Sequence, residues 1–320
     1  MNVITRDTTT RDTGDLQARL RAHIGRHAEK QFDWDAFPSN RGFAELERAQ
    51  MRYVGAGGSP KVGDVSTLKP EHFTVSLIHQ PVGKYAAAHA HEIEEAFLVL
   101  QGVLTVGWER DGNVVEIGLG PKDMIVNVDG IAHGFRNSGV EPVLLSIMVG
   151  SARPLPPSYH AHPKDTGAEL ARAFGAQPGR TARFDAESEH PLQQHMARYV
   201  VRYAERRPHW DAAGIAHMVY VGEGAVAPVG NRKELLTIPR GCGVRGYNRD
   251  VEETFLVIGG CLSVGWEDGG RMAEVRLGPK DLVLSPAGMT HWFRNDGVED
   301  AQVFMVVGSG KVDGVAFVPA

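Results

Sequence analysis

The hydrophobic positions of this chain come in short runs, either continuous or alternating with polar residues, and turn-forming residues separate the runs. Examples are FTVSLIHQ at 73–80, EAFLVLQGVLTVGWE at 95–109, DMIVNV at 123–128 and PVLLSIMVG at 142–150. Runs of this length, bounded by Gly, Pro and Asp, are typical of β-strands. The stretch RDGN at 110–113 indicates a hairpin turn between two of them. Many short strands at regular spacing predict an all-β sandwich or small barrel.

Two segments depart from this pattern and carry apolar residues at helical spacing. Residues 12–30 place two leucines and an isoleucine behind an Asp or Thr that can cap a helix, and residues 192–207 are their counterpart in the second half. We expect both to be short helical arms that pack outside the β-structure or against a partner subunit.

The chain contains the same unit twice. Residues 95–137 and 253–295 align without a gap at an offset of 158, about half of the positions are identical, and both copies contain VGWE and LGPKD. The similarity extends upstream, where MRYVGAGG at 51–58 resembles MVYVGEGA at 218–225. A repeat of this size indicates two copies of one domain.

We therefore divide the chain into three parts. Residues 1–150 comprise a helical arm and the first β-domain, residues 151–190 a linker, and residues 191–320 a second arm and β-domain. The linker is rich in Pro and polar residues and includes one further helix candidate, GAELARAFGA at 167–176.

Composition excludes several classes of protein. The net charge is −5 and there is no block of Lys or Arg, so we expect no binding to nucleic acid. No apolar run reaches the roughly 18 residues of a membrane span. The polar N-terminal stretch lacks the apolar core of a signal peptide, and the two cysteines form no CxxC motif. We therefore expect a cytoplasmic protein without a membrane partner.

The stretch HAHEIEEAFLVLQG at 89–102 carries the candidate chemistry. If the strand is regular, alternation places His89, His91 and Glu95 on one face, and His133 of GIAHGFRN offers a fourth ligand from another strand. Imidazoles and a carboxylate together suit iron, manganese, nickel, copper or zinc. The competing interpretation is a polar strand end. Alternation directs Glu94 away from this face, toward the surface, unless a bulge shifts it.

At this point the chain resembles a bicupin of the cupin superfamily. The residues that match the two cupin motifs are Gly83, His89, His91, Glu95 and Gly102, then Asp123, Gly130, His133 and Asn137. Lys122 and Val128 depart from the second motif, and neither stands at a ligand position. The resemblance implies two tandem jelly-roll barrels. It also implies that His89, His91, Glu95 and His133 bind a divalent metal inside the first barrel.

The second copy departs from the motif at its ligand positions. Tyr247 and Arg249 replace the two histidines of the first motif, whereas Glu253 and His291 remain. A guanidinium cannot coordinate a cation, because it is not deprotonated in proteins. We expect an Arg249–Glu253 pair to fill this pocket, which leaves a supporting barrel or an anion pocket. One metal per chain is the resulting prediction.

A site of three imidazoles and one carboxylate leaves about two open positions on a six-coordinate metal. These suit a bidentate substrate, or a substrate together with O₂. Similar bicupins include dioxygenases, so the resemblance implies an oxygenase that acts on a small chelating aromatic or enolic compound. We expect Fe(II), with Mn, Ni, Cu and Zn as alternatives, and a homo-oligomer. The alternative is a non-oxidative isomerase, lyase, decarboxylase or hydrolase, or a binding protein. Catalytic residues beyond the ligands are unassigned.

Overall fold

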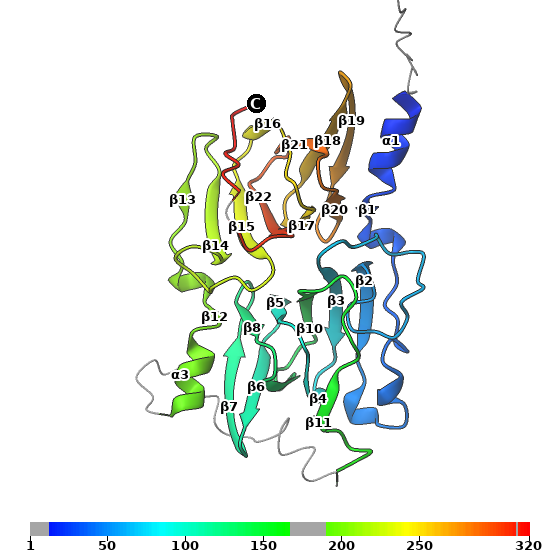
Figure 1. The fold of residues 1–320 in the computed structure, drawn as a ribbon, viewed down its shortest axis with the longest axis vertical. Coiled ribbons are helices and arrows are strands. Elements are labelled where there is room, and N and C mark those ends of the chain that lie inside the picture. The colour runs from blue at the N-terminus through cyan, green and yellow to red at the C-terminus, as the bar shows by residue number, and fades with distance from the viewer. Residues whose placement is uncertain (1–12, 167–189, 312) are drawn as a thin grey trace, which may run out of the picture.

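The computed structural model describes residues 13–166, 190–311 and 313–320. Strands dominate it, and they form two barrels that lie end to end along the long axis of the molecule (Figure 1). The predicted all-β architecture of two jelly-roll barrels is thereby confirmed. No helix in the described ranges is long and apolar enough to cross a membrane.

The first barrel consists of two antiparallel sheets packed face to face. One sheet has the strand order β12-β8-β5-β10-β3-β2 and the other β11-β4-β9-β6-β7. The bounds are β2 Ala49–Val54, β3 Thr74–Gln80, β4 Tyr85–Ala90, β5 Glu95–Gln101, β6 Leu104–Arg110, β7 Asn113–Leu119, β8 Met124–Asn127, β9 Ala132–Arg136, β10 Val143–Val149, β11 Ser158–Ala161 and β12 Val200–Val201. The predicted hairpin joins β6 to β7, and positive φ angles at Asp111 and Gly112 suit its two-residue turn.

The second barrel repeats this arrangement. Its sheets have the orders β1-β20-β17-β22-β15-β14-β13 and β16-β21-β18-β19. The bounds are β1 Ile24–Gly25, β13 His209–Trp210, β14 Ala216–Val221, β15 Arg232–Ile238, β16 Gly243–Tyr247, β17 Glu253–Gly259, β18 Leu262–Asp268, β19 Arg271–Leu277, β20 Leu282–Ser285, β21 Thr290–Arg294 and β22 Ala301–Val307.

The larger sheets of the two barrels pack back to back and share a hydrophobic core. On β5, Phe97 faces the inside of its own barrel, whereas Leu98 faces the other barrel; Phe255 and Leu256 do the same on β17. Both faces of these strands are therefore buried, and every residue of β10 is buried. This explains why 142–150 reads as a continuous apolar run, since a strand covered on both faces needs no polar side.

Each arm crosses to the other barrel. Ile24–Gly25 pairs with β20 of the second barrel, and Val200–Val201 pairs with β8 of the first. The predicted helices are wrong in length: α1 is Thr13–Arg21 and α3 is Pro191–Ala197. Short strands and 3₁₀ turns follow both helices, because the arm must turn to join a sheet edge. Figure 1 shows α1 beside β18 and β19.

The aspartate of each LGPKD motif anchors the arm that arrives from the other half. The Asp281 carboxylate accepts hydrogen bonds from Arg26 Nη1 at 2.7 Å and from the His27 backbone N–H at 2.9 Å. Asp123 accepts the equivalent bond from Arg202 at 2.7 Å. The repeated LGPKD motif thus has a structural role in arm exchange.

The remaining short helices are η1 His27–Glu29, η2 Pro38–Asn40, η3 Ala44–Leu46 and η4 Tyr203–Glu205. The segment predicted as a linker contributes to the first barrel, because Ser158–Ala161 pairs with β4 as strand β11. The helix candidate at 167–176 lies outside the described residues. The domain bounds drawn from the sequence remain a prediction.

Candidate metal centre

His89 and Glu95 lie on two strands in opposite sheets. The prediction of one regular strand is wrong here, because β4 ends at Ala90 and β5 begins at Glu95. Ala86 packs in the barrel core, so strict alternation would turn Ala88 inward instead of His89. The register between β4 and β9 shifts between Ala86 and His89, and this irregularity turns His89 inward, as a bulge does.

The four predicted ligands converge on one point inside the first barrel. Glu95 Oε2 lies 3.0 Å from His133 Nε2, 3.5 Å from His91 Nε2 and 3.7 Å from His89 Nε2. One ligand atom from each of the four residues lies within 4.8 Å of all the others. All four side chains are buried, with exposed fractions of 1 to 6%. The structure therefore brings together every predicted ligand.

Backbone carbonyls fix the orientation of two of the imidazoles. His89 Nδ1 lies 2.7 Å from the Ala87 carbonyl oxygen and His133 Nδ1 lies 3.0 Å from that of Ile131. A neutral histidine that donates its Nδ1–H presents Nε2 as a lone pair, and here that lone pair faces a carboxylate oxygen. Two lone pairs at this distance repel unless a cation lies between them. Among the residues that the structure describes, neither nitrogen of His91 has a hydrogen-bond partner. This donor set fits a metal ion.

The electrostatics of the centre favour a neutral His89 and an ionised Glu95. Burial lowers the pKa of His89 to about 4. Burial alone would raise the pKa of Glu95, but the surrounding imidazoles, His91 first among them, hold it well below its usual range. Burial likewise acts to lower the pKa of His91, and the Glu95 carboxylate outweighs it, so that this pKa is raised. Glu95 therefore supplies one negative charge toward a divalent cation.

Asn127 supports the centre from behind, and no sequence argument identified it. Its Nδ2 donates to the Glu95 carbonyl oxygen at 3.2 Å, and its Oδ1 accepts from Trp108 Nε1 at 2.8 Å. Trp108 is fully buried, as expected for a core residue. Phe97 and Phe135, predicted as pocket wall or core, are buried in the same barrel with ring centroids 5.1 Å apart.

Glu94 corrects the sequence analysis, which placed it at the surface. It is 2% exposed and crosses to the second barrel, where Oε1 accepts from the Gly230 backbone N–H at 3.1 Å and from Asn231 Nδ2 at 3.3 Å. Alternation does direct Glu94 away from the ligand face, as it does Leu98, but the second barrel covers that face, so Glu94 is buried there. Glu252 holds the equivalent position in the second barrel and accepts from backbone N–H groups of residues 71–73.

The second barrel contains an ion-paired cluster where the first has its ligands, as predicted. Glu253 accepts from Arg249 Nε at 2.8 Å, from Tyr247 Oη at 2.8 Å and interacts with His291 Nε2 at 2.7 Å. Asp313, which no sequence motif indicated, pairs with the other side of the Arg249 guanidinium. The fixed cation neutralises Glu253 without a metal.

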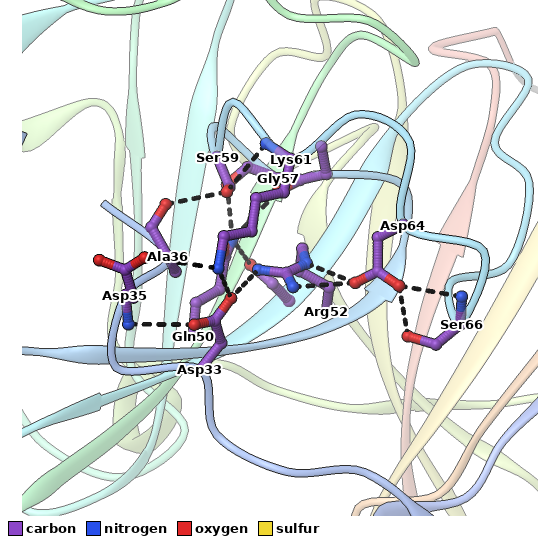
Figure 2. Close-up of polar contacts among 12 residues, drawn as sticks. Asp33, Asp35, Ala36, Gln50, Arg52, Gly57, Ser59, Lys61, Asp64 and Ser66 are labelled. Atoms are coloured by element: carbon purple, nitrogen blue, oxygen red, sulfur yellow. Dashed lines mark hydrogen bonds and ion pairs between the residues drawn. The ribbon is translucent and has the colours of Figure 1, made fainter. Parts of the chain in front are cut away.

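Two other features lie outside this centre. Glu71, His72 and Glu252 come close enough to hold an ion, but two of them are exposed and Glu252 is already engaged by backbone N–H groups. A cavity of about 440 Å³ between the N-terminal arm and β2 is lined by charged and polar residues. Its Arg52 is paired with Asp33 and Asp64 (Figure 2). We assign no metal to either place.

The comparisons with known proteins agree with this architecture. Residues 76–150 match the family model described as Cupin domain. No curated protein sequence matches the chain. The solved structure of Lactobacillus farciminis oxalate decarboxylase in complex with formate is 13% identical, with 92% of this chain and 88% of that chain covered and a TM-score of 0.65.

A structure of Bacillus subtilis oxalate decarboxylase, from a study of its Mn(II) centres, has the same identity and TM-score and covers 92% of this chain and 79% of that chain. At 13% identity these structures establish the fold. The fold is thus that of two tandem barrels like those of these structures, and the match to the Cupin domain model lies within the first barrel.

Proposed function

We propose that the first barrel holds one divalent transition metal through His89, His91, Glu95 and His133, and that the protein is an enzyme that uses it on a small chelating molecule. One observation carries the proposal: three imidazole Nε2 atoms lie 3.0 to 3.7 Å from a single buried carboxylate oxygen. Imidazole and carboxylate donors in this combination suit Fe, Mn, Ni, Cu and Zn.

The chain's own residues divide the work at this site. The carbonyls that accept from His89 and His133 hold their Nε2 lone pairs in place before the ion arrives. Glu95 offsets part of the ionic charge inside a barrel where an unpaired charge is costly. Four ligands leave about two positions of an octahedral ion for a bidentate substrate. The bound ion would supply Lewis-acid and template chemistry and, as iron, a route to O₂.

The specific reaction that we propose is oxygenation. The substrate would be an aromatic or enolic compound with two adjacent oxygen donors, and Fe(II) is the metal that we favour. O₂ would be the second partner. A cytoplasmic location and a homo-oligomer belong to the same proposal.

A second candidate is non-oxidative cleavage, such as decarboxylation, with Mn(II). The likeness in fold to the two oxalate decarboxylases, one of them studied for its Mn(II) centres, supports it. The ligand set suits either metal equally well.

The test combines elemental analysis with a substrate panel. We expect the purified protein to contain about one Fe or Mn per chain. Catechols, β-diketones and small carboxylates would then be supplied with and without O₂, while O₂ uptake and CO₂ release are recorded. O₂ uptake that depends on His133 supports the oxygenase, and CO₂ release without O₂ uptake supports the decarboxylase. A protein that binds no transition metal would contradict both.

A further inference from the structure

Arg48 is a buried cation without a carboxylate partner. It immediately precedes β2 and is only 6% exposed. Its one hydrogen bond within the described ranges is long, 3.4 Å from Nη1 to the Leu46 carbonyl oxygen. No carboxylate of the described residues lies within ion-pair distance of it. Because a buried charge is costly unless it is paired, this guanidinium is suited to an anion that the described residues do not supply.

Aromatic rings connect Arg48 to the metal centre. Its guanidinium carbon lies 4.2 Å from the centroid of the Phe37 ring and 5.9 Å from that of Phe135. Phe135 contacts Phe97, whose ring centroid is 5.9 Å from that of the ligand His133. The charge therefore lies on the aromatic wall that flanks the ligands.

The charge of Arg48 is present at neutral pH. Burial lowers the pKa of Arg48 to about 10, whereas Tyr159 and Glu95 act in the opposite direction. Of these two groups, Glu95 is one of the four candidate ligands. The contact with Phe37 offsets only part of the cost of burial, since cation–π contacts are weaker than buried ion pairs.

The second barrel lacks this cation. Ala49 and Ala216 are equivalent, because each pairs with the equivalent residue of the following strand, β3 or β15. The residue before Ala216 is Ile215, which is fully buried in an apolar core, so isoleucine replaces arginine at the equivalent position. A guanidinium at this position is thus present in the barrel that keeps the four ligands and absent from the barrel that lost them.

We propose that Arg48 binds a carboxylate of the substrate while two other oxygen atoms of that substrate chelate the metal. The inference rests on the proposed function and narrows its substrate class to chelating carboxylic acids. A guanidinium suits this role because it binds a carboxylate through two parallel hydrogen bonds. The aromatic wall between Arg48 and His133 would lie against the apolar middle of the molecule.

Two matched probes test this assignment. 3,4-Dihydroxybenzoate and 3,4-dihydroxybenzamide chelate through the same pair of oxygens, and only the first carries a negative charge. Binding to the Mn(II)-loaded protein, measured by calorimetry without O₂, should favour the benzoate by roughly tenfold to a hundredfold. In Arg48→Met, which keeps the apolar stem, this preference should fall to within about twofold while the metal content and amide affinity remain.

Further variants separate the possible outcomes. Arg52→Met changes another arginine, one that lies within β2 and is paired with Asp33 and Asp64 (Figure 2), and it should keep the preference for the benzoate. Arg48→Lys keeps the positive charge but cannot form two parallel hydrogen bonds to a carboxylate. It should retain part of the preference for the benzoate. An equal preference for the benzoate in wild type and Arg48→Met would overturn the proposed role of Arg48. The absence of any preference in wild type would overturn it too. If wild type binds neither probe, the proposed function fails as well.

Discussion

Glu95 and Glu253 occupy equivalent positions at the starts of β5 and β17, and each carboxylate meets the histidine of its own β9 or β21 strand. The distances are 3.0 Å to His133 Nε2 and 2.7 Å to His291 Nε2. The other neighbours of the two carboxylates differ in charge. The Arg249 guanidinium pairs with Glu253, whereas histidines, which can be neutral, surround Glu95. One barrel contains its own cation and the other is arranged to receive one.

Glu95→Gln tests whether this carboxylate is a ligand. We expect the variant to fold and to bind Mn(II) at least roughly tenfold more weakly, because an amide donates less charge to the ion. Titration of metal into both metal-free proteins gives the affinities. Equal affinities, with only a lower melting temperature in the variant, would assign Glu95 a structural role.

Arg249→Met should destabilise the protein by about 3–5 kcal/mol, because it leaves the buried Glu253 carboxylate without its cation. Urea unfolding measures the loss. Arg294→Met is the control, because Arg294 forms partly exposed ion pairs with Glu274 and Asp296, and its loss should cost roughly 0–1 kcal/mol. Similar losses of unfolding free energy in the two variants would show that the buried cluster in the second barrel stabilises the fold no more than an exposed ion pair does.

Asp281→Ala should loosen the N-terminal arm. It removes the acceptor of two hydrogen bonds from the arm, donated by Arg26 and the His27 backbone, and of a third from the Gly278 backbone, and we expect a loss of about 1–3 kcal/mol. Hydrogen exchange should become faster in residues 13–30. Asp123→Ala is the matched variant and should instead affect the second arm around Arg202. An arm that exchanges at the wild-type rate in Asp281→Ala would contradict the anchoring role.

His217 should make stability depend on pH. Burial alone would lower its pKa, but Glu234 at 2.9 Å and Asp211 at 3.0 Å outweigh burial and raise it. The protonated ring is thus favoured in the folded state. Its stabilisation is complete below the unfolded pKa of about 6.5 and is lost as pH rises through the higher folded value.

The measurement is urea unfolding of metal-free protein at several pH values. His217→Gln should flatten the decline in stability above about pH 6.5, since the variant has no proton to release there. His160→Gln, which changes an exposed histidine, should keep the wild-type profile. An unchanged profile in His217→Gln would refute this assignment.

The repeat and the β-patterning allowed the two barrels to be predicted, but not the exchange of arms. The two barrels present similar sheet edges, and each offers the aspartate of an LGPKD motif, here Asp123 and Asp281. An arm therefore fits either barrel, and local sequence does not decide between them. The helices were overestimated for the same reason: the turn that follows Arg21 serves contacts made only in the folded chain.

The four candidate ligands that converge in the structure could be named from the sequence because they stand in two short motifs, although the single-strand argument for the first motif was wrong. Glu94 was misplaced because its partners, Gly230 and Asn231, belong to the other barrel. Arg48 was missed because a lone arginine in a polar stretch has no local signal. The alignment of Met51 with Met218 would have revealed it, since that alignment sets Arg48 against Ile215.

The metal content per chain tests the central claim most directly. Elemental analysis of wild type should give about one divalent transition metal, as four ligands in one barrel require. His91→Ala and His133→Ala should each lose most of it, because the remaining ligands are placed for a complete shell. Arg249→Met should keep it. Two metals per chain, or metal that persists in His133→Ala and disappears in Arg249→Met, would contradict the account.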